Sequence, residues 1–86
     1  MPVLGKILVV DDDPTITKLL ETKLEEHGYR VLAVGDGQEA LAQYHAFQPD
    51  LIIFDILMPN MDGYTFVLEF KKIGDRAVAF LYFRER

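Results

Sequence analysis

The residues best suited to chemistry are three aspartates that follow short apolar segments. Asp11 and Asp12 come directly after the apolar residues 7–10, and Asp55 comes directly after the apolar residues 51–54. Carboxylates gathered at one place repel one another, and a bound cation relieves that repulsion. Magnesium suits such a site because it prefers oxygen ligands and keeps several of its waters. Since a carboxylate beside magnesium can attack a phosphoryl group, we expect Asp55 to be such a nucleophile.

Zinc and the remaining aspartates fit this chemistry less well. The chain has no cysteine, and neither histidine follows an apolar segment, which disfavours zinc. Asp13 precedes Pro14 and is typical of a helix N-cap. Asp36 and Asp50 lie in turn-like sequences, where aspartate forms local hydrogen bonds. Position therefore singles out the three aspartates that end apolar segments.

The elements that must position these aspartates alternate along the chain. Continuous apolar segments are typical of strands covered on both faces, and apolar residues three or four apart are typical of helices. The sequence predicts strands over residues 7–10, 29–34, 51–54 and 77–83, and helices over residues 14–27, 38–47 and 63–72. Such alternation builds an α/β fold, a parallel sheet with helices on both faces. Ligands of these sheets bind beyond the carboxyl ends of the strands, where the three aspartates fall.

Each predicted helix has an apolar face that we expect to pack on the sheet. Gly28 is the expected end of the first helix. The expected buried residues are Ile16, Leu19, Leu20 and Leu24 in the first helix, Ala40, Leu41, Tyr44 and Phe47 in the second, and members of the aromatic set Tyr64, Phe66 and Phe70 in the third.

Size and charge narrow the function classes. The 86 residues suffice for one domain, and no apolar segment approaches the roughly 20 residues that cross a membrane. The formal net charge is −5 and no basic stripe is present, so we expect no nucleic-acid partner. The first residues lack the layout of a signal peptide. A cytoplasmic protein without a membrane partner is the expectation.

Three ordered segments resemble the receiver domain of two-component response regulators. They are residues 6–14, 36–41 and 49–63, and the resemblance covers about residues 4–73. It implies a flavodoxin-like (CheY-like) fold with strand order 2-1-3-4-5, of which this chain holds about four strands and three helices. Residues 1–86 are thus expected to form a truncated receiver domain, with residues 74–86 as a divergent fourth strand and end.

The resemblance also implies a role for individual residues. Asp55 matches the phosphoacceptor, Asp12 a direct magnesium ligand, and Asp11 a partner that acts mainly through water. The backbone carbonyl of Leu57 matches the remaining protein ligand of the metal. The implied phosphoryl donor is a histidine kinase, a phosphotransfer protein or a small phosphodonor. The chain would act in a phosphorelay as an acceptor and not as an enzyme.

The chain departs from the family pattern near its end. Tyr82 falls where receivers place a threonine or serine, and Phe83 falls where they place a small residue. The chain has no counterpart of the helix that follows in receivers, of their lysine-bearing fifth strand or of their last helix. Arg84 is the only cation near the site that we propose in place of that lysine, because Lys71 and Lys72 are on the third helix. The uncharged fourth strand then has an open edge, so we expect self-association into a homo-oligomer that completes the fold.

Two other functions follow from the same residues. The first alternative is a self-associating structural or interaction fragment in which phosphorylation switching is impaired or lost. A phosphatase of the haloacid-dehalogenase type would require a second aspartate two residues after Asp55. That position is Leu57, which argues against this function.

Overall fold

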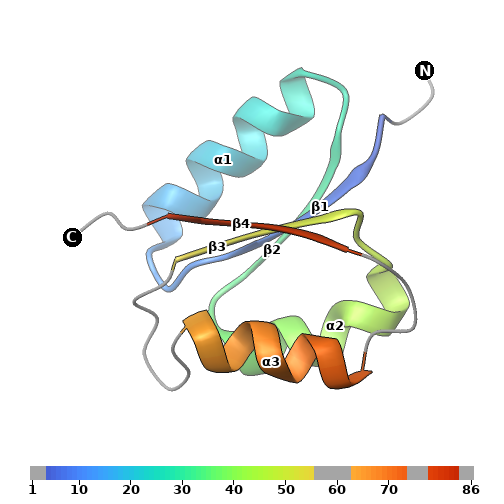
Figure 1. Ribbon diagram of the computed structural model, residues 1–86. Coiled ribbons are helices and arrows are strands. Elements are labelled where there is room, and N and C mark those ends of the chain that lie inside the picture. Colours follow the sequence, from blue (N-terminus) through green and yellow to red (C-terminus); the bar gives the residue numbers. More distant parts are fainter. Residues whose placement is uncertain (1–3, 56–62, 74–77, 84–86) are drawn as a thin grey trace.

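The computed structural model describes residues 4–55, 63–73 and 78–83. Four parallel strands form one sheet in the order β2-β1-β3-β4, as Figure 1 shows. The strands are β1 (Lys6–Val10), β2 (Arg30–Val34), β3 (Leu51–Asp55) and β4 (Ala79–Phe83). The order confirms the predicted parallel α/β sheet, with β1 and β3 at its centre.

Helices cover both faces of the sheet, as expected. They are α1 (Pro14–Glu26), α2 (Gly37–Phe47) and α3 (Gly63–Ile73). In Figure 1, α1 lies on one face, and α2 and α3 lie together on the other. Right-handed crossovers explain this division, because the connection from β1 to β2 runs across the sheet in one direction and the two later connections run in the other.

The alternation of side chains along the strands separates two apolar layers. On the α1 face, Ile7, Val9 and Ile53 pack with half-buried side chains of α1. On the other face, Leu8 and Phe54 pack against α2 and α3. Because successive strand residues point to opposite faces, continuous apolar segments are required where both faces are covered.

Polar caps fix where the helices begin and end. The Asp13 carboxylate accepts a hydrogen bond from the Thr15 backbone N–H at 2.9 Å, which confirms Asp13 as the N-cap of α1. Pro14 is the first residue of that helix, and Gly28 follows its end with a φ of +96° that favours glycine. Asp36 caps α2 by accepting from the Glu39 backbone N–H at 2.8 Å.

The expected burial of the α1 face was wrong in part. Leu19 is 53% exposed, and Ile16, Leu20 and Leu24 are half-buried. Asp50 Oδ2 accepts from the Lys6 backbone N–H at 2.8 Å, which joins the residue before β3 to the start of β1. Ala40, Tyr44, Phe66 and Phe70 are buried as predicted, whereas Leu41 and Phe47 are half-buried.

None of the helices in the described ranges combines the length and apolar character that crossing a bilayer requires.

Candidate functional site

The candidate site lies beyond the carboxyl ends of the two central strands. Val10 of β1 is level with Phe54 of β3, so the residues that follow them, Asp11 and Asp55, lie side by side. The Asp11 backbone N–H also donates to the Val34 carbonyl at 3.2 Å, which extends the pairing of β1 with β2 to this point. Strand pairing therefore holds the backbone of both aspartates, through β2 at Asp11 and through β4 at Asp55.

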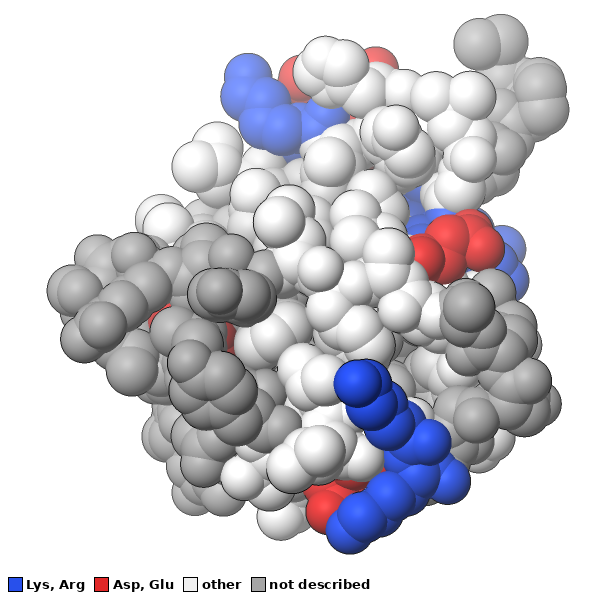
Figure 2. All heavy atoms as spheres, in the orientation of Figure 1, with Lys and Arg blue, Asp and Glu red and all other residues white. Residues whose placement is uncertain are grey.

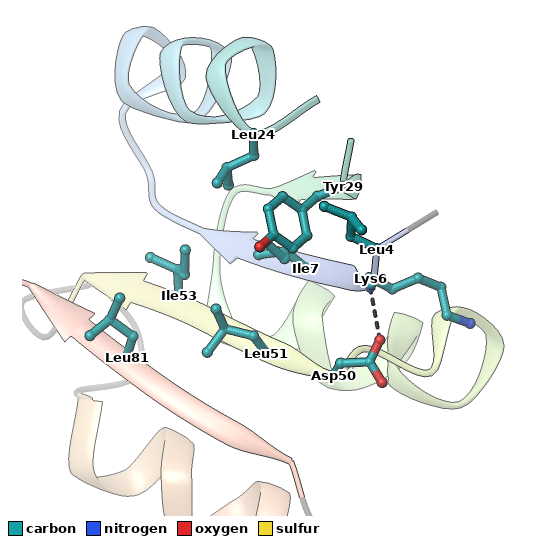
Figure 3. A pocket seen from close by; sticks show the side chains of 10 residues that line it. Leu4, Lys6, Ile7, Leu24, Tyr29, Asp50, Leu51, Ile53 and Leu81 are labelled. Carbon is teal, nitrogen blue, oxygen red and sulfur yellow. Dashed lines mark hydrogen bonds between the residues drawn. The ribbon is translucent and has the colours of Figure 1, made fainter. Parts of the chain in front are cut away.

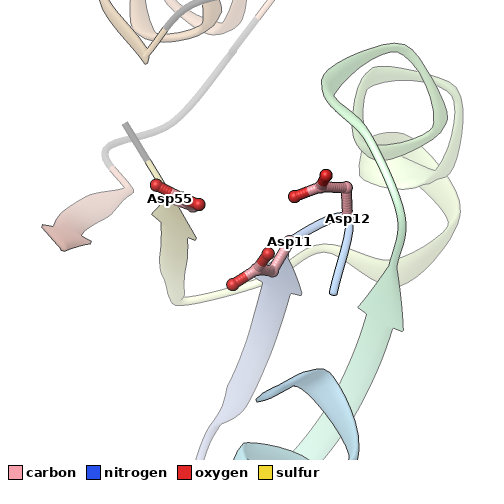
Figure 4. A group of neighbouring side chains, drawn as sticks. All are labelled: Asp11, Asp12 and Asp55. Carbon is pink, nitrogen blue, oxygen red and sulfur yellow. The ribbon is translucent and has the colours of Figure 1, made fainter. Parts of the chain in front are cut away.

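The three aspartates singled out by the sequence meet in one cluster. Asp11, Asp12 and Asp55 each offer a carboxylate oxygen, and these oxygens all lie within 4.8 Å of one another (Figure 4). Asp11 is 1% exposed and Asp55 is 0% exposed, whereas Asp12 is exposed to solvent. The cluster is thus buried on the strand side and reaches solvent at Asp12.

The beginning of α1 holds Asp11 in place. The Asp13 backbone N–H donates to Asp11 Oδ1 at 3.0 Å, while the Asp13 side chain caps the helix. The positive end of the helix dipole also favours negative charge at this position. Sequence reasoning assigned Asp13 to capping alone and missed the contribution of its backbone, although the run Asp11-Asp12-Asp13 placed that N–H next to the cluster.

The donor set fits a hard cation such as magnesium. Three carboxylates supply only oxygen ligands, which magnesium prefers, and the exposed position of Asp12 leaves room for coordinated water. Taking two carboxylates out of water is costly unless charge or hydrogen bonds compensate them. A divalent cation among these oxygens would supply that compensation.

Two residues of the expected site lie outside the described part of the chain. They are Leu57, whose carbonyl is the expected fourth protein ligand, and Arg84. In β4 the backbone of Phe83 is level with Asp55, and Tyr82 is level with Phe54. Lys71 and Lys72 are exposed in the last turn of α3, and Lys72 Nζ pairs with Glu69 Oε1 at 3.1 Å.

A separate apolar groove lies on the α1 face of the sheet, toward the amino ends of β1 and β3. It has a volume of about 350 Å³, and Figure 3 shows Leu51, Ile53 and Leu81 along one side of it. Its charged lining residues are Lys6 and Asp50, at the end of the strands opposite to the aspartate cluster. The groove and the cluster are therefore different features.

Comparison with known families identifies the family of the chain. A family model described as "Response regulator receiver domain" matches residues 7–81. The chain belongs to the response regulator receiver family. This assignment confirms the resemblance on which the expected fold was based.

Individual receiver proteins show the same likeness. The chain is 45% identical over 76 residues to "Probable transcriptional regulator ycf27" of Guillardia theta and 48% identical over 58 residues to "Alkaline phosphatase synthesis transcriptional regulatory protein PhoP" of Bacillus subtilis (strain 168). These matches cover 88% and 67% of this chain, and 30% and 24% of the two relatives. The chain thus spans about a third or less of the curated relatives that it matches.

Solved receiver structures confirm the fold. The N-terminal domain of a response regulator receiver protein from Methanoculleus marisnigri JR1 has a TM-score of 0.85 and 39% identity, over 92% of this chain and 65% of that one. The chemotaxis response regulator CheY4 of Vibrio cholerae has a TM-score of 0.78 and 37% identity, over 83% of this chain and 59% of that one. The predicted CheY-like architecture of four strands and three helices is therefore correct.

Proposed function

We propose that this receiver module accepts a phosphoryl group on Asp55, assisted by magnesium, and passes signals in a phosphorelay. The observation that carries the proposal is the meeting of Asp11, Asp12 and Asp55 within 4.8 Å at the end of the central strands of a receiver fold. Asp55 is the proposed acceptor because it matches the phosphoacceptor position of receivers, and the pairing of β3 with β4 holds its backbone. Asp11, Asp12, Asp55 and the backbone carbonyl of Leu57 are the proposed magnesium ligands.

The proposed reaction is a phosphoryl transfer that balances without a redox partner. An oxygen of the Asp55 carboxylate forms a bond to phosphorus, and the bond from phosphorus to the donor breaks. The donor atom, a histidine nitrogen or the oxygen of an acyl phosphate, leaves with the electron pair. The product is an aspartyl phosphate on Asp55.

The protein groups of the site position the reacting carboxylate and balance the charge that develops during the transfer. Bound magnesium would neutralise charge that develops on the transferred oxygens. The Asp13 N–H holds the Asp11 carboxylate, and β3 fixes the backbone of Asp55, before a donor arrives. Asp12 supplies a ligand on the solvent side, where a metal ion can enter.

The proposed partners follow from this chemistry. A histidine kinase or a phosphotransfer protein in the cytoplasm supplies the phosphoryl group, and the chain acts as the acceptor and not as an enzyme. Two relatives carry names of transcriptional regulators, but this acidic chain, with its net charge of −5, is proposed to signal without contacting nucleic acid itself.

A phosphoryl mimic tests this proposal. The chain is mixed with beryllium fluoride and magnesium, and fluorine NMR records the bound species. We expect a bound signal that requires both the metal and Asp55, so that it is lost with a chelator and in Asp55→Asn. Asp13→Asn is the matched control, because asparagine keeps the helix cap while removing a neighbouring charge. A signal that persists in Asp55→Asn would reject Asp55 as the acceptor.

A further inference from the structure

The cap of α1 and the aspartate cluster share one residue. Asp13 Oδ1 accepts from the Thr15 backbone N–H at 2.9 Å and so caps the helix. The backbone N–H of the same residue donates to Asp11 Oδ1 at 3.0 Å. The side chain of Asp13 therefore bonds forward into the helix, while its backbone bonds back to a proposed magnesium ligand.

The start of the helix fixes the backbone of Asp13. Its φ of −92° and ψ of 108° are extended, as is usual for an N-cap residue, and Pro14 follows with a restricted φ. The Asp13 carbonyl accepts from the backbone N–H groups of Ile16 and Thr17, each at 3.1 Å. The side chain and the carbonyl thus hold this residue on the helical side, and its N–H bonds on the other side to Asp11.

The carboxylate of Asp11 depends on such a contact for its orientation. Asp11 is 1% exposed, so solvent can do little to solvate it. Its backbone N–H pairs with the Val34 carbonyl at 3.2 Å, which holds the main chain but leaves the side-chain torsions free to turn. The Asp13 N–H bonds to the carboxylate itself. That bond favours the orientation in which the oxygens of the cluster lie within 4.8 Å of one another.

The positive side chains nearest along the chain are engaged elsewhere. The lysines of α1 pair with glutamates three residues further on, at 3.9 Å and 4.0 Å. On the face drawn in Figure 2, the Lys and Arg side chains of the described residues lie at the top, the right and the bottom. In the same orientation, β1 and β3 end at the left (Figure 1). The contact that α1 makes with Asp11 is therefore a backbone N–H and not a cationic side chain.

We propose that Asp13 is a positioning residue for magnesium: by capping α1, its side chain holds the N–H that orients the Asp11 carboxylate. This inference rests on the proposed function, since Asp11 is one of the proposed ligands. Groups that orient a metal ligand contribute to the affinity for the metal without touching it. Asparagine at this position offers the same cap oxygen, whereas alanine offers none.

Titration of the 86-residue chain with magnesium, followed by calorimetry, tests the inference. We expect the dissociation constant in Asp13→Ala to be at least about threefold higher than in Asp13→Asn; this is less than the loss of about tenfold that is typical when an orienting group is removed, because alanine keeps the N–H. Both substitutions remove the charge at this position, so their difference reports the cap and not the charge. A ratio below about threefold would overturn the inference.

The cap of α2 provides the matched control. Asp36 Oδ1 accepts from the Glu39 backbone N–H at 2.8 Å, so Asp36→Ala removes a cap of the same kind, and Asp36→Asn keeps it. We expect Asp36→Ala to lower the midpoint of urea unfolding relative to Asp36→Asn, as Asp13→Ala does relative to Asp13→Asn, but to leave the magnesium dissociation constant unchanged. An equal rise of that constant at both positions would assign the effect to general loosening of the fold and overturn the inference.

Hydrogen exchange gives a readout that needs no metal. The backbone N–H of residue 13 should exchange faster in Asp13→Ala than in Asp13→Asn, while the N–H groups of β1 and β3 keep their rates, because the bond to Asp11 is the one that weakens. Equal rates at residue 13 would overturn the inference. Absence of magnesium binding by the unmodified chain would overturn the proposed function as well, whereas magnesium binding of equal affinity in the two variants would overturn this inference alone.

Discussion

At the scale of single residues, the proposed chemistry of this receiver module depends on buried carboxylates. Asp11 and Asp55 are carboxylates with almost no solvent exposure, and burial of that kind requires compensation. The Asp13 N–H and the positive end of α1 supply part of it, and a cation held by the cluster would supply more. The cluster could be predicted because residue type and position agreed: each aspartate followed a segment that was apolar enough to be a strand.

Asp12 provides the clearest test of metal binding. Asp12→Ala is expected to weaken magnesium affinity by about tenfold or more, since even groups that support a metal ligand contribute that much. Because the clustered carboxylates repel one another without a cation, the free energy of unfolding without magnesium should not fall in this variant. Calorimetric titration with magnesium measures the affinity, and Asp13→Asn should titrate like the unmodified chain. Unchanged affinity in Asp12→Ala would remove Asp12 from the site.

Tyr44 carries a polar atom in the apolar core. It is 1% exposed, and its hydroxyl has no hydrogen-bond partner among the described residues. Its ring packs edge to face against Phe70, with 5.0 Å between ring centroids. Tyr44→Phe keeps this packing and removes the unsatisfied hydroxyl, so we expect the free energy of unfolding to rise by about 1 kcal/mol. Urea unfolding measures it, and a loss of stability would show that the hydroxyl is bonded.

At the scale of elements, the strands and helices were predictable because their apolar residues are spaced differently. They are continuous in the strands and lie three or four residues apart in the helices. Every predicted element exists, and the described bounds differ from the predicted ones by one or two residues, as at Lys6 and Glu26. The exposure of Leu19 was not predictable. Helical spacing shows which residues share a side of a helix, but the contact of α1 with the sheet determines how wide the buried side becomes.

The hydrogen bonds between the starts of β1 and β3 should contribute to the stability of the fold. Lys6 and Asp50 exchange two bonds of 2.8 Å, one from the Lys6 N–H to the Asp50 carboxylate and one from the Asp50 N–H to the Lys6 carbonyl. Asp50→Ala removes the first of these and should lower the free energy of unfolding by about 1 kcal/mol. Asp50→Asn keeps an acceptor oxygen and should lose less. Equal losses in urea unfolding would assign the effect to charge and not to this bond.

At the scale of the whole molecule, the sheet order decides where the aspartate cluster lies. Placing β1 and β3 at the centre brings Asp11 and Asp55 together, although Asp55 comes 44 positions after Asp11 in the sequence. Their meeting results from the order of the strands in the sheet. The alternation of strands and helices in the sequence predicted this meeting of side chains in the same way. The Leu57 carbonyl could be inferred only from family resemblance, because every residue carries a backbone carbonyl and its type gives no signal.

Magnesium should stabilise the whole fold, because a ligand that binds only the folded state shifts the unfolding equilibrium. At about a hundred times its dissociation constant, magnesium should raise the free energy of unfolding by about 2.7 kcal/mol. Urea unfolding at fixed protein concentration measures this gain with magnesium and with a chelator. The gain should be smaller in Asp55→Asn, which lacks one of the clustered carboxylates. An equal gain in both proteins would place the stabilising ion elsewhere.

The central claim is that Asp55 accepts a phosphoryl group, and intact-mass spectrometry tests it most directly. The chain is incubated with acetyl phosphate and magnesium, and its mass is recorded before the acyl phosphate hydrolyses. We predict a gain of one phosphoryl group that disappears when magnesium is chelated and in Asp55→Asn, and that persists in Asp13→Asn. No gain in the unmodified chain, or an equal gain in Asp55→Asn, would contradict the claim.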